Sequence, residues 1–595
     1  MSVDNKVPER RSDANPSGVH ASAKGTLVDR IRRVLPGIDV LRQYDLSNGR
    51  SDLVAAIVVA LVLIPSALAY AELARCPPAA GLYAAVAGMV TFAFFTRSRH
   101  LIVGPDAAIS LLVGAAIGPL VGEDPGKAVA LAGILSLLTA GVLFLMARLR
   151  LGIAADFLSS PALLGFMNGA AIVIVGSQIG KLFGIPLTES NTLLRFWEWI
   201  SNIGSVHGPT IVMGLICIAA LAFCRRALPR VPGAIVVFLI AVSAGRVLDF
   251  TLLGMQVIGA VDLRLPIAVR PGLNPSEAAP LFTAAIGIAL LVFSEGVVLG
   301  RTVARKHGYQ IDPDHELIAF SAANAAAGLV GSFAIGSSQT RTLLNDATGG
   351  RTQVVSFLAS AIVMVTAILL MPWIATMPSV AIAAILIFTG VTLVDFPLYG
   401  RLWRMHRFSM VVAAATTAGV VVIGVLPGIL LGIFLSLLGV LASIIRPQDA
   451  LLGCVPGSTT LHDVGDDEAA ETIPGLVVYR FYGPVIFANI RFFVERVEWF
   501  LSQEETPVRE VILDARAIPG IDVTAAEQLA DFVTALRKRQ IEVVIVKAHL
   551  PLRESLSHFS PGFEACPRFS QLSDAVAAFQ ERQDGNRHPP ESPDS

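Results

Sequence analysis

Long apolar stretches dominate the chain between residues 52 and 446, and short polar or Pro/Gly-containing breaks separate them. Many stretches approach the roughly 20 residues that a helix needs to cross the hydrocarbon core of a bilayer. The pattern predicts about fourteen helical segments, at 53–72, 79–96, 107–121, 128–148, 161–184, 208–224, 232–248, 280–300, 314–331, 338–346, 352–373, 378–394, 408–425 and 427–445.

Two of these segments, the third and the tenth, are too short to span a bilayer. The third begins with the extended run Leu101-Ile-Val-Gly-Pro-Asp106, and the tenth follows Phe333-Ala-Ile-Gly-Ser-Ser-Gln-Thr340. Interrupted segments at corresponding positions of two halves are typical of inverted-repeat transporters, whose binding site lies where the half-helices meet. Irregular backbone at that depth is tolerated only around a cavity. The spacing therefore predicts two inverted halves of seven spans each, with a site between the half-helices.

Composition supports a membrane protein. Of 595 residues, 54% are hydrophobic and 15% are charged, with a mean hydropathy of +0.67, whereas soluble domains usually carry about a quarter charged residues. The net charge of −1 excludes a general basic field for nucleic acid. From Pro447 onward the chain is less apolar and acidic, with 13 Lys+Arg and 23 Asp+Glu. The five cysteines lack C-x-x-C spacing and predict neither a disulfide framework nor a zinc site, and we expect no signal peptide.

Basic residues alternate between successive connections. If the N-terminus is cytoplasmic, every second connection carries the Lys/Arg excess expected of a cytoplasmic loop, at residues 97–99, 148–150, 225–230, 301–306, 351, 401–407 and 446. The opposite connections hold only scattered basic residues, such as Lys127 and Arg264. An even number of spans in a multi-pass cell-membrane protein, with both termini in the cytoplasm, fits this distribution.

The half-helices predict an anion site. Each helix N-terminus presents free N–H groups and about half a positive charge, and Arg341 lies in the first turn of the second half-helix. Together these charges suit a dianion. Hydroxyl and amide groups at the same tip, on Ser337, Ser338, Gln339 and Thr340, are candidate ligands, although they could only cap the helix. Arg341 could instead pair with Asp346.

Glu295 is the only ionisable residue between Leu281 and Gly300, and a charge in the middle of a bilayer costs at least about 2.5 kcal/mol. Coupling explains it best, because a protonated or cation-paired Glu295 would no longer repel a dianion. The alternative is a structural salt bridge with a neighbouring span. Asp106, in the first turn of the other half-helix, is a second candidate for protonation, with a structural N-terminal carboxylate as the favoured interpretation.

The first span contains Pro65, which removes a backbone hydrogen bond and frees carbonyl groups. Ser66 and Tyr70 follow at helical spacing and are candidates to line the cavity. Plain packing explains Tyr70 equally well.

These residues carry a family resemblance. The chain contains Asp52-Leu-Val-Ala-Ala, Ile64-Pro-Ser-Ala-Leu-Ala-Tyr-Ala, Pro77-Pro-Ala-Ala-Gly-Leu-Tyr83, Ser98-Arg-His-Leu-Ile-Val-Gly-Pro105, Glu316-Leu-Ile-Ala, Asn324 and Thr348-Gly-Gly-Arg-Thr-Gln353. From about Asp52 to Phe579 it resembles the SulP sulfate permease family, which includes the animal anion exchangers and prestin.

The resemblance implies a core domain, made of spans 1 to 4 and 8 to 11, that moves against a gate domain made of the others. It also implies that the substrate lies between 65–70, 104–108, Glu295 and 337–341, which adds Gly104, Ala107 and Ala108 to the candidate residues. Many members carry Gln where this chain has Ser66, and substrate preference could shift with it. Arg341 matches the arginine of the animal exchangers, and Glu295 matches an acidic position used for cation coupling in bacterial bicarbonate relatives.

The last part of the chain alternates apolar strands, at 476–481, 485–488, 511–514 and 543–546, with amphipathic helices such as 492–501. This predicts an α/β domain. It resembles the STAS domain of SulP proteins, especially in Ile521-Asp-Val-Thr-Ala525. In related anti-sigma antagonists a hydroxyl residue of this loop is phosphorylated. Thr524 is thus a regulatory candidate, but it begins a Thr-Ala-Ala-Glu capping box, which favours a helix cap.

The sequence therefore predicts five parts: a cytoplasmic segment (1–51), a transmembrane anion-transport domain (52–446), a linker (447–473), a STAS domain (474–583) and a disordered tail (584–595). We expect a secondary active importer of an inorganic oxyanion, sulfate first, driven by proton or sodium symport, and not an enzyme. Bicarbonate or a C4-dicarboxylate are rival substrates, and an uncoupled exchanger or channel is a rival mechanism. No cofactor is expected beyond the coupling ion. The expected partners are the anion, the lipid bilayer and a second copy of the chain. A cytoplasmic protein bound to the STAS domain is a candidate partner, and nucleic acid is not expected.

Overall fold

The structure is a computed structural model, which describes residues 35–121, 125–152, 159–189, 191–228, 231–259, 275–455, 460–547 and 566–583. The expected disordered tail and most of the N-terminal segment lie outside these ranges. The chain forms two compact units, the first ending at Phe434 and the second beginning at Leu435.

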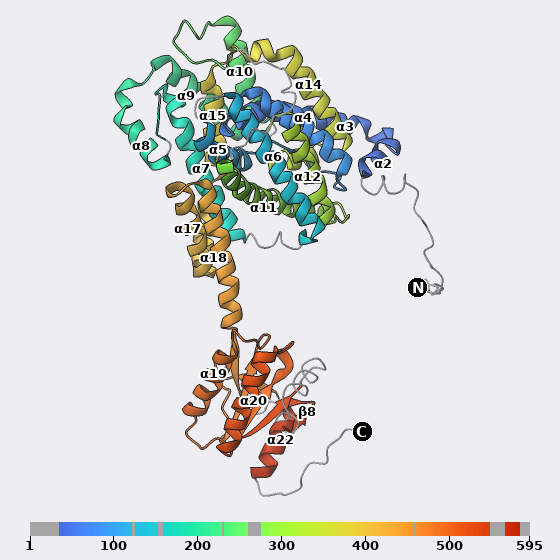
Figure 1. The fold of residues 1–595 in the computed structure, drawn as a ribbon, viewed down its shortest axis with the longest axis vertical. Coiled ribbons are helices and arrows are strands. Elements are labelled where there is room, and N and C mark those ends of the chain that lie inside the picture. Colours follow the sequence, from blue (N-terminus) through green and yellow to red (C-terminus); the bar gives the residue numbers. More distant parts are fainter. Residues whose placement is uncertain are drawn as a thin grey trace, which may run out of the picture. The chain divides into compact units, whose positions relative to one another are not determined.

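The first unit is helical (Figure 1). In the described part of the chain, nine helices are long and apolar enough to cross a membrane. The fourteen expected segments correspond to α3 (Gly49–Leu73), α4 (Pro78–Phe95), α5 (Ala107–Val121), α6 (Pro125–Arg148), α7 (Ser160–Phe183), α9 (Gly208–Ala227), α10 (Gly233–Val247), α11 (Pro275–Lys306), α12 (Pro313–Leu329), α13 (Gln339–Ala347), α14 (Val354–Ile374), α15 (Ser379–Leu393), α17 (Arg407–Val422) and α18 (Val425–Ile445).

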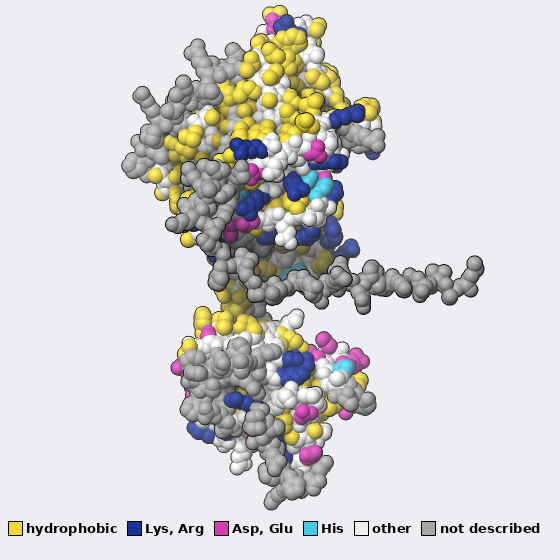
Figure 2. All heavy atoms as spheres, turned by 90° about the vertical axis from the view of Figure 1, so that its right-hand side faces the viewer, with side chains coloured by type: hydrophobic (Ala, Val, Ile, Leu, Met, Phe, Trp, Pro, Cys, Tyr) yellow, Lys and Arg dark blue, Asp and Glu magenta, His cyan; other side chains and the backbone are white. Residues whose placement is uncertain are grey.

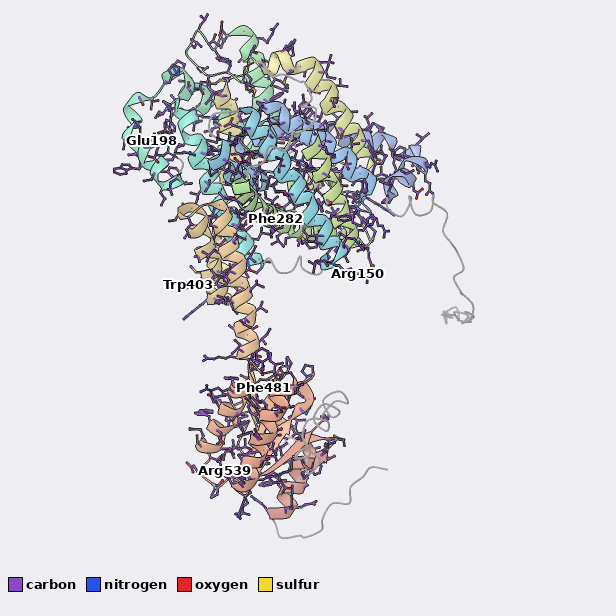
Figure 3. All side chains as sticks on the ribbon, viewed as in Figure 1. Arg150, Glu198, Phe282, Trp403, Phe481 and Arg539 are labelled. Atoms are coloured by element: carbon purple, nitrogen blue, oxygen red, sulfur yellow. The ribbon has the colours of Figure 1, made fainter. Side chains whose placement is uncertain are left out.

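The helices are apolar on both faces because one face meets other helices and the other is left for lipid. In α14, for example, Ser356, Ala359 and Ser360 are buried, whereas Ile368 and Leu369 are 61% and 66% exposed. Small residues on the buried face let neighbouring helices approach closely. Figure 2 shows hydrophobic side chains covering a broad surface of this unit, and Figure 3 labels one of them, Phe282 on α11.

The helices pack in two groups. Helices α3, α4, α5, α6, α11, α12, α13 and α14 contact one another around the short helices, and α7 packs against α9, α15 and α17. The contacts of Gly296 illustrate the closeness in the first group, because a Cβ atom there would lie 2.3 Å from the Phe320 ring. The first group has the membership that the resemblance implied for the core domain, whereas α10 contacts helices of both groups (α3 and α14, α9 and α15), so the gate domain stays a prediction.

Among the described residues of the first unit, the sequence pattern missed three helices, α2 (Pro36–Arg42), α8 (Thr192–Ser201) and α16 (Phe396–Met405). Figure 3 labels Glu198 on α8 and Trp403 on α16. Both of these helices have 10 residues and are apolar on one face only, so an average over a span-length window conceals them.

The second unit contains an α/β domain, whose described residues form a six-stranded sheet in the order β4-β3-β5-β6-β7-β8. The strands are β3 (Asp449–Cys454), β4 (Leu461–Asp463), β5 (Leu476–Phe481), β6 (Glu510–Asp514), β7 (Glu542–Val546) and β8 (Arg568–Phe569), and the helices are α19 (Ile490–Gln503), α20 (Val523–Lys538) and α22 (Leu572–Gln583). The strands from β5 to β8 run parallel, and β3 runs antiparallel to both β4 and β5.

Three features of this domain differ from the sequence expectations. The segment expected to be a linker contains β3 and β4, because residues 449–451 pair with β5. The expected strand at 485–488 is only an isolated bridge between Val485 and Ile521. The expected capping role of Thr524 is wrong: Asp522 caps α20 by accepting a 2.8 Å hydrogen bond from the Ala525 amide, and Thr524 is exposed in the first turn.

Candidate functional site

The two interrupted segments meet inside the first unit. Val103 and Gly104 form a two-residue antiparallel pairing (β1, Val103–Gly104) with Ser337 and Gly336 (β2, Gly336–Ser337). The Ser338 amide also donates to the Ile102 carbonyl at 3.0 Å. Because α5 begins at Ala107 and α13 begins at Gln339, this pairing brings the N-termini of the two short helices together.

Side chains of α13 tie it to the extended run before β1. Thr342 accepts a 3.0 Å hydrogen bond from the Ile102 amide, and Asn345 donates to the His100 carbonyl at 2.9 Å. Gln353 donates to the carbonyls of Ser98 and Leu101, at 2.8 and 2.9 Å. These bonds satisfy backbone groups that have no helical partner, which a low-dielectric interior requires.

Helices α12 and α11 hold β2 from the other side. Asn324 on α12 accepts a 2.9 Å bond from the Ile335 amide and donates to its carbonyl at 3.1 Å. A Cβ atom on Gly336 would lie 2.2 Å from Ile109 and 3.6 Å from Val292 on α11. Since Val292 precedes Glu295 by about one turn, β2 lies beside the part of α11 that carries Glu295.

Arg341 is 2% exposed and points across the junction rather than along its own helix. Its Nη2 donates to the Pro105 carbonyl at 2.7 Å. Gly104 makes this approach possible: its φ is +147°, which favours glycine, and a Cβ atom there would lie 3.3 Å from Nη2. The alternative pairing of Arg341 with Asp346 is wrong, because Asp346 accepts instead from Lys306 and His307, both at 2.6 Å.

Asp106 occupies the N-terminus of α5. One carboxylate oxygen accepts from the Ala108 amide at 3.1 Å, and the Asp106 carbonyl accepts from the Ser110 amide at 2.9 Å. Asp106 therefore acts as the N-cap, the structural role favoured from sequence. It lies within Coulomb range of both Arg341 and Tyr70. One of the two electropositive tips thus already carries a carboxylate.

Glu295 is partly buried on α11 and interacts electrostatically with Asp106. Within the described ranges it has neither a hydrogen bond nor an ion pair. A structural salt bridge, the alternative explanation of Glu295, is therefore absent from that part of the chain. The site combines one guanidinium with two carboxyl groups, which would repel each other if both were ionised.

The other candidate residues differ in how they meet this centre. Ser66 is 8% exposed, and its hydroxyl donates to the Val62 and Leu63 carbonyls of its own helix, at 2.9 and 3.0 Å, next to Pro65. Tyr70 is partly buried one turn later. The remaining positions are Ala107, Ala108, Ser337 and Ser338, which are buried, and Gln339 and Thr340, which are exposed.

Two buried acids that the sequence yielded only as family motif residues hold the surrounding loops. Asp52 accepts from the Arg351 amide at 2.7 Å and from the Thr352 hydroxyl at 2.6 Å. Glu316 accepts from the Thr96 hydroxyl at 2.6 Å and from the Arg97 amide at 3.0 Å. An acidic residue at the end of an apolar segment was the signal that could have identified them as anchors for a neighbouring loop.

Comparison with known proteins gives this arrangement a context. Residues 50–416 match the sulfate permease family, and residues 469–565 match the STAS domain. A probable sulfate transporter of Mycobacterium tuberculosis is 34% identical over 549 residues, which cover 92% of this chain and 98% of the relative. A probable sulfate transporter of Arabidopsis thaliana is 29% identical, over 89% of this chain and 87% of the relative.

Solved structures share the fold at lower identity. The murine Slc26a9 anion transporter in the inward-facing state superposes with a TM-score of 0.84 at 21% identity, over 95% of this chain and 96% of that chain. The transmembrane domain of the cyanobacterial bicarbonate transporter BicA gives 0.58 at 19% identity, over 66% of this chain and 98% of that chain.

Proposed function

The chain belongs to the sulfate permease family, and on that basis we propose that it is a secondary active transporter of an inorganic oxyanion, sulfate first, driven by proton or sodium symport. The observation that carries the proposal is the β1–β2 pairing, which joins the tips of α5 and α13 beside the buried Arg341 guanidinium. The family consists of multi-pass membrane transporters rather than enzymes.

Charge balance explains why a cation would accompany the anion. The two helix tips supply about half a positive charge each and Arg341 supplies one, so together they balance a dianion. Ionised Asp106 and Glu295 remove that balance. A proton or sodium ion at Glu295 restores one positive charge, and the anion in turn favours cation binding by the same free energy.

The backbone at the junction provides the ligands. Arg341 binds Pro105 through Nη2, and its buried Nε has no hydrogen-bond partner among the described residues, so Nε is a donor for an anion at the tip of α13, together with the first amides of that helix. Ser337 and Ser338 are buried beside this tip and supply hydroxyl donors. Ser66 and Tyr70, on α3, form the opposite wall.

Transport then requires the site to face each side of the membrane in turn. The helices that hold the tips pack as one group, and α7, α9, α15 and α17 pack as another. A relative shift of the two groups, with the tips carried along as a rigid part of the first, is the motion that we propose. We further propose cytoplasmic termini, a homodimer and regulation through the STAS domain.

An uncoupled exchanger is the second candidate mechanism, and Arg341 favours it, because a permanently charged guanidinium needs no proton to attract an anion. Bicarbonate and C4-dicarboxylates remain candidate substrates for the same site.

Uptake of radiolabelled sulfate into proteoliposomes tests the proposal. We expect uptake to rise with an inward proton or sodium gradient, and Glu295→Gln to abolish that dependence while retaining exchange. Glu277→Gln is the matched control, because Glu277 lies on the same helix about five turns away and pairs with Lys127. The coupling role would be refuted if wild-type sulfate uptake did not depend on either the proton or the sodium gradient and Glu295→Gln had the same uptake as the wild type.

A further inference from the structure

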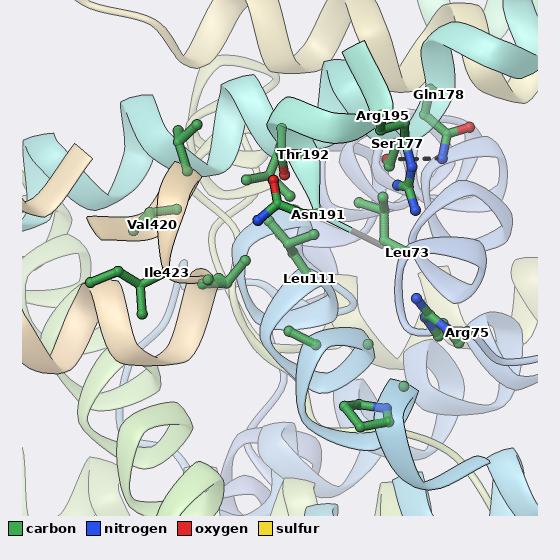
Figure 4. A pocket seen from close by; sticks show the side chains of 18 of the residues that line it. Leu73, Arg75, Leu111, Ser177, Gln178, Asn191, Thr192, Arg195, Val420 and Ile423 are labelled. Carbon is green, nitrogen blue, oxygen red and sulfur yellow. Dashed lines mark hydrogen bonds between the residues drawn. The ribbon is translucent and has the colours of Figure 1, made fainter. Parts of the chain in front are cut away.

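A cavity of about 680 Å³ lies beside the candidate site, against the C-terminal ends of α3 and α5 (Figure 4). One wall consists of Leu73 at the end of α3, of Arg75 just after it, and of residues between Leu111 and Pro119 on α5. The other consists of α7, α8 and the turn between α17 and α18. Ala108, at the candidate site, and Gly118, at the cavity, are separated by about 15 Å along α5. Leu111, the first α5 residue in the cavity wall, is only about 4.5 Å along the helix from Ala108, so the cavity begins next to the site and extends away from it.

The charged side chains that line this cavity are mainly basic. They are Arg75, Lys181, Arg195 and Glu72. Lys181 and Glu72 neutralise each other in an ion pair at 2.5 Å. Two positive charges remain, and Figure 4 shows both arginines beside the same opening, with Leu73 between them.

Arg75 is held in place without a counter-charge. Its backbone adopts a positive φ of 56°, which non-glycine residues rarely do. Its guanidinium lies against the backbone of α5 at Gly118, where a Cβ atom would be 3.0 Å from both Nε and Cζ. Among the described residues, no hydrogen bond or ion pair satisfies this guanidinium.

Arg195 faces Arg75 from helix α8. Its Nε donates to the Glu189 carbonyl at 2.7 Å, which leaves both terminal nitrogens toward the cavity. The nearby Glu198 carboxylate is engaged by the amides of Thr188 and Glu189, at 3.0 to 3.1 Å. Burial lowers the pKa of Arg195, and the charge of Arg75 lowers it further. The two arginines therefore repel each other across the cavity, while the Glu198 and Glu189 carboxylates act on the pKa of Arg195 in the opposite direction.

Helix α8 is fixed firmly enough to hold Arg195 there. Its N-cap Asn191 accepts from the Leu193 amide at 2.9 Å, and Phe196 lies against Gly176 of α7. Trp197 and Ile200 are 69% and 52% exposed on the opposite face. An amphipathic helix of this kind lies at a membrane surface with its apolar face in lipid.

We propose that this cavity is a second anion-binding site, in which Arg75 and Arg195 hold a small inorganic oxyanion before it enters the central site or after it leaves. The inference rests on the proposed transport function in one respect, the side of the membrane from which the anion reaches the cavity. With the cytoplasmic termini proposed above, the cavity opens to the extracellular side. An anion between the guanidinium groups relieves their repulsion. The apolar wall at Val420 to Val425 limits the water that would screen the charges.

Sided sulfate transport is the first test. In proteoliposomes of defined orientation, Arg75→Gln combined with Arg195→Gln should raise the KM for sulfate applied at the cavity side by roughly ten-fold, about three-fold for each partly exposed charge, with kcat retained. The KM from the opposite side should not change. Lys at both positions should restore the KM. Arg246→Gln is the control for surface charge, because the Arg246 guanidinium lies at the end of α10 and stacks on Trp373.

Salt supplies a readout that packing alone would not change. The wild-type KM from the cavity side should rise with ionic strength, because the two guanidinium groups are partly exposed, and the double Gln variant should lose most of this dependence. An unchanged KM with unchanged salt dependence in the double Gln variant would overturn the proposal.

Equilibrium binding separates failure of this site from failure of the proposed function. The purified full-length protein should bind two labelled sulfate ions per chain at concentrations just sufficient to fill both sites, and at these concentrations Arg341→Gln should lose one ion and the double Gln variant should lose most of the other. If the wild-type protein transports no sulfate but the double Gln variant still loses one bound ion, the proposed transport function is wrong and the second site is retained. A single bound ion that survives in the double Gln variant contradicts the second site alone.

Discussion

Replacing Arg341 is the most direct test of the central site. In the structure its guanidinium donates to the Pro105 carbonyl at 2.7 Å and is 2% exposed, so its charge acts in a medium with little water. An anion over the α13 tip would lie about 5 Å from this charge. At an effective dielectric constant of about 20, the attraction is about 3 kcal/mol for each unit of anion charge.

Relaxation of the site and entry of water should recover about half of the attraction lost by a dianion. Arg341→Gln should then cost about 3 kcal/mol of binding free energy, which corresponds to a roughly 100-fold weaker affinity. The Gln side chain is too short to reach Pro105, but the β1–β2 pairing and the bonds of Thr342 and Asn345 should keep the junction intact. Arg341→Lys keeps the charge but loses the planar fork, and we expect a loss of about ten-fold.

The assay is sulfate uptake by proteoliposomes, with KM and maximal rate measured separately, and with the unfolding temperature of each variant recorded. Arg351→Gln is the matched control, because Arg351 holds Asp52 through its backbone amide and its side chain is exposed. Arg341→Gln with a wild-type KM and a wild-type unfolding temperature would refute the electrostatic role of Arg341.

Three further predictions concern the rest of the fold. Asp52→Asn should lower stability by about 2–4 kcal/mol and reduce folded protein, measured by thermal unfolding, because a buried carboxylate that accepts several bonds is lost. Burial raises the pKa of Glu510 to about 7, despite the nearby Arg582, so the folded state binds this proton more tightly than the unfolded state. The stability of the STAS domain should therefore fall by about 3 kcal/mol between pH 4.5 and 7, and Glu510→Gln should remove this slope in hydrogen exchange of β6 amides. Asp522→Ala should destabilise α20 by about 1 kcal/mol in chemical unfolding, whereas Thr524→Ala should have little effect, and equal losses would restore the capping role of Thr524.

Sequence predicted the membrane helices well because the requirement for a long apolar stretch is local and strong. The expected range 107–121 coincides with α5, and 338–346 differs from α13 by one residue at each end. Helix α8 was missed because its apolar residues do not form a long continuous stretch and only one of its faces is buried. Thr192 is buried, whereas Leu193 and Leu194 are exposed. Such a short helix is visible only as periodicity, which averaging over a span removes.

The contents of the site were only partly predictable. Gly-Pro breaks and helix spacing indicated which residues would meet, since the two halves repeat. The spacing of residues along the sequence does not say which way a side chain points at the junction, and so it cannot predict individual hydrogen bonds. The bond from Arg341 to the Pro105 carbonyl is one example. The sequence also failed to predict β3. The acidic residues that follow this strand suggested a linker, although residues 449–451 pair with β5.

The family motifs and the candidate anion ligands divide the work of the site between them. Asp52, Glu316 and Asn324 form hydrogen bonds to backbone or hydroxyl groups of neighbouring segments, and each is at most 1% exposed. Their hydrogen bonds hold the segments that flank the tips of α5 and α13, whichever anion is bound there. Choice of substrate therefore falls to side chains at the tips and on the α3 wall opposite them, and we expect substrate preference to diverge first at Ser66 on that wall. Ser66→Gln should change the ratio of sulfate to bicarbonate uptake without changing the unfolding temperature, whereas a parallel loss of both anions would mean that Ser66 serves only the packing of α3.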